Sequence, residues 1–141
     1  MADIVHELDI AAPPDRVFEA VTTQEGLASW WTTDVSTTGT LGSEAVFGFE
    51  GHTQEMRMRI EALEPPELVQ WTCLHGPDEW VDTTIAFRIE PGAVGTSSVV
   101  RLWHGDWEYE DGIMPRVSFR WAIALESLRL YLETGTGDPA R

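Results

Sequence analysis

Two histidines are the residues of this chain best placed for acid–base chemistry. His6 shares a period-two face with Ile4 and Leu8, and His104 shares one with Leu102. Such alternation is typical of strands with one covered face, so both imidazoles are expected to point inward. An inward imidazole is commonly a hydrogen-bonded core residue, but it can also orient a ligand or move a proton near neutral pH. The sequence leaves both roles open.

The other reactive residue types give weaker signals. The four histidines, which include His52 and His75, show no short metal-ligand spacing. Cys73 is the single cysteine, lacks a neighbouring signature of an activated thiol, and is expected to be a small core residue. The chain has no nucleophile elbow, phosphate loop or dinucleotide fingerprint, and it has no lysine for a Schiff base. No catalytic residue, metal or cofactor is therefore predicted.

Seven tryptophans offer aromatic surface to an apolar ligand. Trp30 and Trp31 either stack on such a ligand or anchor a pair of helices, with one ring buried and the other half exposed. A cavity mouth is expected at Trp71, Trp107, Met114 and Trp121. The full set of candidates for the lining of an internal cavity is His6, Trp31, Phe47, Phe49, Met58, Trp71, Cys73, His104, Trp107, Met114 and Trp121.

The elements that must position these side chains begin with a strand over residues 4–10. Pro13 and Pro14 stop it, and because proline suits the first turn of a helix, residues 14–22 are predicted to be helical. A second short helix is predicted over residues 27–31. The first strand is thus followed by two small helices.

Glycines and prolines divide the middle of the chain into short apolar alternations at hairpin spacing. The predicted strands cover residues 45–50, 54–63, 68–74, 80–89 and 97–107. Alternation places Val69, Trp71 and Cys73 on one face of the third of these strands. Successive hairpins indicate an antiparallel sheet.

A helix is predicted over residues 112–133, where the apolar period changes to that of a helix. Its inward face is expected to hold Met114, Val117, Trp121, Ala124, Leu125, Leu128 and Leu132. A second apolar stripe, formed by Phe119, Ile123 and Leu130, lies on the opposite side. It is explained either by a homodimer contact or by coverage from the preceding loop. Residues 1–135 are expected to form one domain, with a frayed tail over 136–141.

The composition narrows the class of protein. The chain has 141 residues, a formal net charge of −15 and a hydrophobic fraction of 43%. With 24 acidic residues against nine arginines, phosphate backbones and anionic membranes should be repelled, so neither nucleic acid nor membrane is an expected partner. The start of the chain lacks the basic residues of a secretory signal, and a cytoplasmic location is expected.

Short motifs in order along nearly the whole chain resemble a known family. They are Ala12–Pro14 with Val17–Phe18, Trp30–Trp31, Glu64–Val69 before Trp71, Thr84–Phe87, Gly95–Thr96 and Leu102–Trp107. Together they resemble the START-like, birch-pollen-allergen-like superfamily, in its branch of heat-shock-protein ATPase activator homologues. The resemblance implies an α+β helix-grip fold, in which a curved antiparallel sheet of about six to seven strands wraps the long C-terminal helix and encloses a cavity. Met58 stands where this family often carries glycine and would fill part of that cavity.

Three functional hypotheses follow, because such a fold does not choose a function. The first is a binding domain without defined catalysis, whose cavity holds a small hydrophobic or aromatic ligand. The second is an aromatase/cyclase-type enzyme, in which His6 or His104 moves protons on a polyketide-like substrate. The third, implied by the resemblance alone, is a partner that activates a chaperone ATPase.

Overall fold

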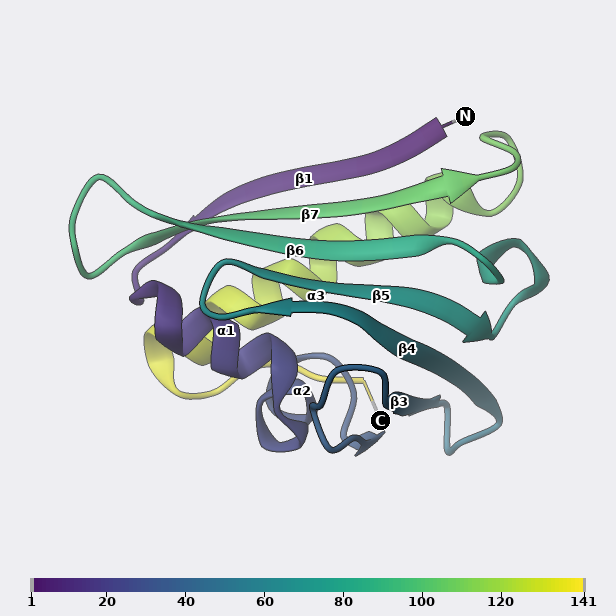
Figure 1. The fold of residues 1–141 in the computed structure, drawn as a ribbon, viewed down its shortest axis with the longest axis horizontal. Helices are drawn as coiled ribbons and strands as arrows, with labels where there is room; N and C mark the ends of the chain where they lie inside the picture. Colours follow the sequence, from purple (N-terminus) through teal and green to yellow (C-terminus); the bar gives the residue numbers. More distant parts are fainter. Residues whose placement is uncertain (1, 141) are drawn as a thin grey trace.

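The computed structural model describes residues 2–140 as one curved sheet with α-helices packed against it (Figure 1). The elements are β1 (Ala2–Ile10), α1 (Pro14–Thr22), α2 (Gln24–Trp30), β2 (Asp34–Ser36), β3 (Glu44–Phe49), β4 (Gln54–Glu64), β5 (Leu68–His75), the 3₁₀ turn η1 (Asp78–Trp80), β6 (Thr84–Pro91), β7 (Ser98–Trp107) and α3 (Met114–Thr134). The predicted α+β class is confirmed, with two short helices after the first strand and a long helix at the end.

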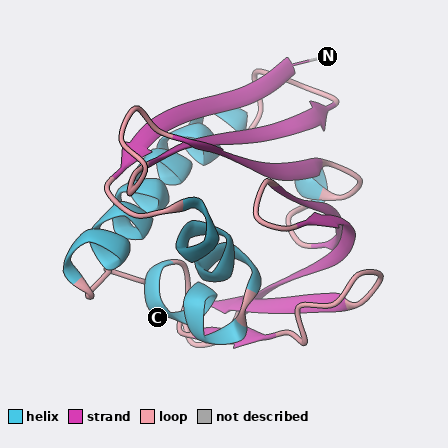
Figure 2. Ribbon diagram, turned by 60° about the vertical axis from the view of Figure 1, so that its left-hand side comes forward, coloured by secondary structure: helices cyan, strands magenta, loops and turns pink. Residues whose placement is uncertain are grey.

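The seven strands form an antiparallel sheet in the order β1-β7-β6-β5-β4-β3-β2. Figure 2 shows this sheet bent around the helices. Ile4 lies opposite His104, and His6 lies opposite Leu102. The two alternating faces predicted from the sequence are therefore the same face of the sheet, and it is the one that meets α3.

A proline at the start and a glycine after the end set the bounds of helix α3. Pro115 lies in its first turn, where a missing N–H costs nothing, and Gly135 follows it with a φ of 90°, a left-handed conformation that favours glycine. The buried apolar side chains of α3 come from the predicted inward face and include Val117, Trp121 and Leu128, whereas buried Ser127 was not predicted. On the other side Phe119 is 69% exposed and Ile123 is 56% exposed.

Helices α1 and α2 are held together by close backbone contact. A Cβ on Gly26 would lie 2.6 Å from the Cα of Ala20, so only glycine allows this approach. The indole N–H of Trp30 donates to the carbonyl of Ala20 at 2.8 Å. Trp30 is 1% exposed and Trp31 is 8% exposed, so the expectation that one ring of the pair is half exposed is wrong.

Two segments of the middle region differ from the predicted strands. Strand β2 was not predicted, because three residues that pair along β3 carry too short an alternation to detect. The strand expected to begin at Trp80 begins at Thr84 instead. Residues before it turn because Thr83 donates through its hydroxyl to the carbonyl of Trp80 at 2.6 Å and Asp82 has a φ of 70°.

The residues after α3 return to the body of the molecule, where fraying was expected. The N–H of Ala140 donates to the carbonyl of Trp31 at 2.8 Å, and the N–H of Thr33 donates to the carbonyl of Ala140 at 3.0 Å. The N–H of Asp138 donates to the hydroxyl of Ser127 at 2.7 Å. Through these bonds residues 136–140 lie beside the end of α2, whereas residue 141 is outside the described residues.

Candidate functional site

A groove of about 1130 Å³, open to solvent, lies along the first half of α3. Its opposite wall comes from the end of β3 and the start of β4, where Phe49 and Met56 contribute side chains. Trp31 and Trp80 lie between these walls, and the C-terminal residues 138–140 border the groove at one end. Side chains from five separate parts of the chain therefore meet here.

The floor of the groove is one side of an aromatic cluster. The ring of Trp31 stacks on Trp121 with centroids 5.3 Å apart, and on Trp71 with centroids 6.0 Å apart. Phe47 and Trp30 also contact Trp31, at 4.5 and 6.0 Å. Offset stacking of this kind adds stability beyond that of the buried area.

The structure brings some of the predicted site residues together and separates others from the groove. Trp31, Phe49 and Trp121 line it. The predicted candidates that do not line it are His6, Phe47, Met58, Trp71, Cys73, His104, Trp107 and Met114. Six of these are at most 1% exposed, namely Phe47, Met58, Trp71, Cys73, His104 and Trp107. The expected mouth at Trp71 and Trp107 is therefore packed core.

Sequence reasoning missed several lining residues. Met56 lies on the same strand face as Met58 and follows from the same alternation. Arg116 and Arg120 flank the predicted inward face of α3, so helical spacing could have placed them at the border of a groove. The same spacing could not have shown which side chains lie opposite them. Pro139 gave no signal in the sequence, since its place depends on how the tail returns.

His104 is fully buried in a hydrogen-bond chain that fixes its tautomer. The indole N–H of Trp121 donates to Nδ1 at 3.0 Å, and because an indole nitrogen is only a donor, Nδ1 carries no proton. Nε2–H then donates to the hydroxyl of Thr83 at 2.8 Å, and that hydroxyl donates to the carbonyl of Trp80. Burial lowers the pKa of His104 to about 3. The imidazole is thus neutral at physiological pH and has both nitrogens engaged.

His6 links the edge strand β1 to α3. Its Nε2 lies 3.1 Å from the carbonyl oxygen and 3.2 Å from the hydroxyl of Ser118. The ring is half-buried, on the far side of α3 from the groove-lining Arg116 and Arg120. Its contacts hold strand and helix in register.

Cys73 has the surroundings of an inert thiol. It is fully buried, and burial raises its pKa to about 11. Its thiol donates weakly to the carbonyl of His75, at 3.5 Å. The interpretation of Cys73 as a small core residue agrees with this environment.

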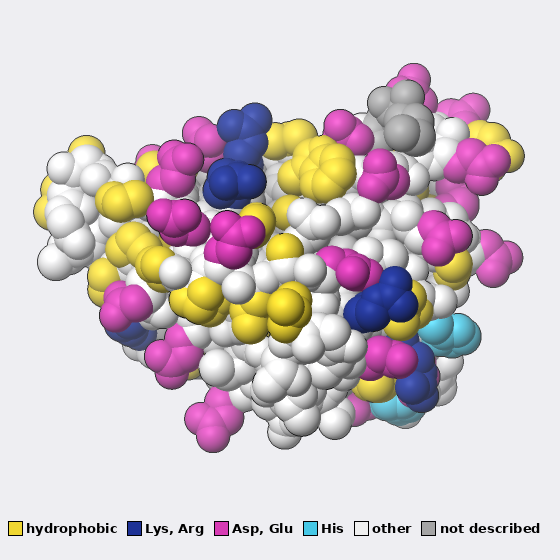
Figure 3. Space-filling view, viewed as in Figure 1, with side chains coloured by type: hydrophobic (Ala, Val, Ile, Leu, Met, Phe, Trp, Pro, Cys, Tyr) yellow, Lys and Arg dark blue, Asp and Glu magenta, His cyan; other side chains and the backbone are white. Residues whose placement is uncertain are grey.

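Charge is unevenly distributed around the groove. The surface seen in Figure 3 carries many acidic side chains and few basic ones, in keeping with the net charge of −15. In the groove, however, Arg116 and Arg120 project from α3, and Glu50 and Asp138 come from the other borders. The groove is therefore less acidic than the rest of the chain.

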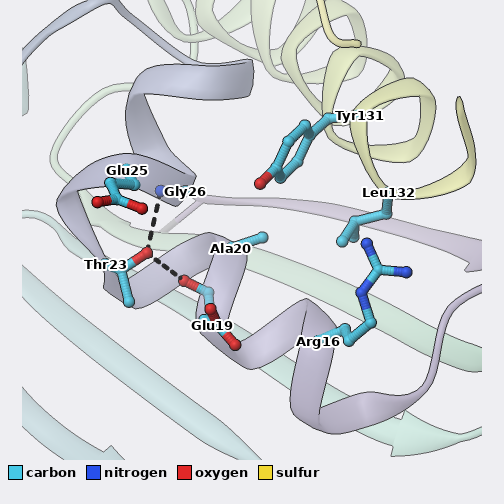
Figure 4. Close-up of a pocket in the computed structure, with 8 residues that line it drawn as sticks. All are labelled: Arg16, Glu19, Ala20, Thr23, Glu25, Gly26, Tyr131 and Leu132. Carbon is cyan, nitrogen blue, oxygen red and sulfur yellow. Dashed lines mark hydrogen bonds between the residues drawn. The ribbon is translucent and has the colours of Figure 1, made fainter. Parts of the chain in front are cut away.

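A second, smaller crevice of about 160 Å³ lies between α1, α2 and the end of α3. Figure 4 shows the hydroxyl of Tyr131 directed toward it and the side chain of Arg16 at its other end. Thr23 accepts from the N–H of Gly26 at 3.0 Å and caps α2 there. With mostly polar walls and little volume, this crevice suits water better than an apolar ligand.

Residues 2–140 offer neither a metal site of clustered ligands nor a membrane-spanning helix. This range contains no group of three or more His, Cys, Asp or Glu side chains arranged to hold a metal ion. None of its helices is both long enough and apolar enough to cross a membrane.

Comparison with known proteins places the chain in a family. The model of the family described as "Activator of Hsp90 ATPase homolog 1-like protein" matches residues 11–133. The solution structure of the Aha1 dimer from Colwellia psychrerythraea is 34% identical, with a TM-score of 0.86, over 97% of this chain and 100% of that one. No curated protein matches in sequence.

Two more distant structures share the fold. A protein from Staphylococcus saprophyticus is 24% identical with a TM-score of 0.82, over 99% of this chain and 98% of that one. DynU16, from the dynemicin biosynthetic locus, is 22% identical with a TM-score of 0.78, over 96% of this chain and 48% of that one. The START-like resemblance read from the sequence is confirmed by the family match and these structures.

Proposed function

The chain belongs to the Activator of Hsp90 ATPase homolog 1-like family, and from this premise we propose that it is a binding domain for a small hydrophobic or aromatic ligand. The observation that carries the proposal is the groove of about 1130 Å³ beside α3. Its size is on the order of the ~300 to 1,000 Å³ of known ligand pockets. Apolar side chains make up most of its lining, with a few polar groups among them.

The lining also lacks the imidazoles on which the cyclase hypothesis rests. It contains no His, Cys, Ser, Thr, Tyr or Lys among the residues that the structure describes. His104, one of the two imidazoles that the cyclase hypothesis offered, lies outside the lining with both ring nitrogens bonded. His6 also lies outside it, against Ser118. We therefore do not extend the proposal to cyclase chemistry.

A neutral fluorescent probe tests the proposal. Nile red should bind the wild-type protein, and Ala124→Trp should weaken this binding more than about tenfold, a loss of about 1.4 kcal/mol, because Ala124 lines the groove and a bulky ring there would occupy it. Ala122→Trp is the matched control, since Ala122 is exposed on the same helix and does not line the groove. Absence of binding to the wild type, or equal binding to all three proteins, would refute the proposal.

A second proposal concerns self-association. Phe119 and Ile123 are large exposed apolar side chains one helical turn apart on α3, and Leu130 extends the same stripe as a half-buried residue. Such a stripe is typical of a contact surface, and the relative from Colwellia psychrerythraea is described as a dimer. We propose that two copies meet through Phe119 and Ile123, which also line the groove, so the second copy would border the ligand site.

Light scattering on a gel-filtration column checks this contact. The wild-type chain should elute with the mass of two chains, and Phe119→Glu with Ile123→Glu should give the mass of one. A single-chain mass for the wild type at high concentration would exclude the contact.

The family description supports one further candidate, a partner of a chaperone ATPase. In this case the purified chain should raise the ATP hydrolysis rate of an Hsp90-type ATPase in a coupled assay. An unchanged rate at saturating concentrations of the chain would remove this candidate without affecting the groove.

A further inference from the structure

We propose that the ligand of the groove carries a carboxylate, and that Arg116 and Arg120 bind it. This inference rests on the proposed binding function and adds the chemical class of the ligand. Both arginines line the groove and are four residues apart on α3. Side chains at this spacing are neighbours on one side of a helix, so two guanidinium groups can reach the same anion.

Arg116 and Arg120 share with Arg16 and Arg88 the lack of a carboxylate within 4 Å among residues 2–140, but of these four only Arg116 and Arg120 line the groove. Arg57, Arg59, Arg101 and Arg129 each have a carboxylate within 4 Å. Within residues 2–140, Arg116 and Arg120 have no such partner, although the sequence has 24 acidic residues against nine basic ones. Despite this excess of acidic residues, no carboxylate of the described chain lies within 4 Å of Arg116 or Arg120.

A guanidinium group matches a carboxylate in shape as well as in charge. Its planar fork donates two parallel N–H bonds to the two oxygens, and such charge-assisted bonds are stronger than neutral ones. Arg116 lies in the first turn of α3, where the helix dipole also favours a negative charge.

The remaining lining gives the orientation. Glu50 lies in the turn after β3, and the N–H of Asp138 bonds to Ser127, about two turns along α3 from Arg120, so both carboxylates belong to other borders of the groove than the arginines. They repel an anionic group from those ends. The anionic group therefore lies against Arg116 and Arg120, and the apolar body of the ligand extends over Trp31 and the walls.

The charge of the whole chain limits the ligand further. A net charge of −15 makes each additional negative charge on a ligand harder to bring to the surface. Two guanidinium groups can hold one carboxylate against this field. The class is thus a monocarboxylate on an aromatic or aliphatic body.

A pair of probes that differ only in charge separates the carboxylate from the apolar body. Naphthalene-2-carboxylate and its neutral primary amide have the same ring and nearly the same shape, and their affinities are measured by displacement of Nile red. We expect the wild type to prefer the carboxylate by about tenfold, which is the low end of the worth of charge-assisted hydrogen bonds. Arg116→Gln with Arg120→Gln should abolish the preference, so that carboxylate and amide bind with equal affinity.

The matched control is Arg88→Gln with Arg101→Gln. These arginines are exposed and lie opposite each other on β6 and β7, outside the groove, so the double change alters the net charge equally. It should keep the preference for the carboxylate.

The outcomes distinguish the inference from the function on which it rests. Equal binding of carboxylate and amide to the wild type, or the same loss of preference in both double variants, overturns the carboxylate inference while the apolar site stands. Failure of Nile red and of both naphthalene probes to bind overturns the proposed function itself. Circular dichroism of each variant establishes that a lost preference comes from the site and not from unfolding.

Discussion

Acidification should destabilise this protein through His104 in a way that a single substitution can isolate. Burial lowers the folded-state pKa of His104 to about 3. The hydrogen bond that Nδ1 accepts from Trp121 also requires the neutral ring. In the unfolded chain a histidine has a pKa of about 6.5. Between these values the unfolded chain binds a proton that the folded chain does not, so stability is lost as the pH falls below about 6.5.

The size of the effect follows from the same two values. Each pH unit within this window costs ~1.36 kcal/mol, so lowering the pH from 7 to 5 should remove about 2 kcal/mol of the free energy of unfolding through His104 alone. Over this range most carboxylates stay ionised, which limits their contribution. For a small domain with a total stability of about 5 to 15 kcal/mol, this is a large fraction.

Urea unfolding of the wild type and of His104→Gln at both pH values measures this contribution. Glutamine does not titrate, so the loss between pH 7 and pH 5 should be about 2 kcal/mol smaller in the variant than in the wild type. NMR gives an independent reading if the variant folds poorly. In the wild type the His104 ring should carry its proton on Nε2 and should not titrate above about pH 4. A ring that titrates near pH 6.5 would refute both the buried hydrogen-bond chain and the argument built on it.

Three other predictions concern single residues outside the groove. The pKa of His52 is raised, chiefly by its hydrogen bond with Asp34. The stabilisation that His52 provides is therefore present below about pH 6.5 and is lost as the pH rises through its folded-state pKa. In urea titrations His52→Gln should be less stable than the wild type at pH 6, and the difference should shrink toward pH 9. Glu79 accepts from the N–H of Ile113 at 3.2 Å, and Glu79→Ala should lower the free energy of unfolding by about 1 kcal/mol, because the start of α3 loses its acceptor. The thiol of Cys73, with a pKa of about 11, should react with Ellman's reagent at pH 8 only after denaturant is added.

Each of these predictions has a control or a contrary result. A margin between the wild type and His52→Gln that stays constant from pH 6 to pH 9 would show that His52 does not titrate against the carboxylates around it. For Glu79, the control is Glu110→Ala in the exposed loop before α3, which should change stability by less than about 0.5 kcal/mol. Fast labelling of Cys73 in the native protein would mean that the strand carrying it opens readily.

Periodicity in the sequence predicted which face each element buries. Alternation put His104 inward on its strand and Val69, Trp71 and Cys73 on one side of theirs, and all four are buried. Helical spacing likewise put Trp121 inward on α3. These results follow because the direction of a side chain depends on its own backbone, which repeats every two residues in a strand and about every 3.6 in a helix.

Periodicity did not predict how deeply an inward side chain is buried. Trp71 was expected at a cavity mouth, but the ring of Trp31 covers it at a centroid distance of 6.0 Å. The alternation of one strand gives no information about which distant side chain packs over it. Trp71 therefore became core, and Trp31 became part of the floor of the groove.

The sequence by itself determined the class of fold, the family resemblance and the acidic surface, because these depend on local patterns and on composition. Only the tertiary structure decided where the groove lies, since Phe49, Arg116 and Pro139 are far apart in the chain and meet only once the sheet curves and the tail returns. It also decided that His104 is a neutral core residue. Its hydrogen bonds come from Thr83 and Trp121, and those partners depend on how β6, β7 and α3 pack together.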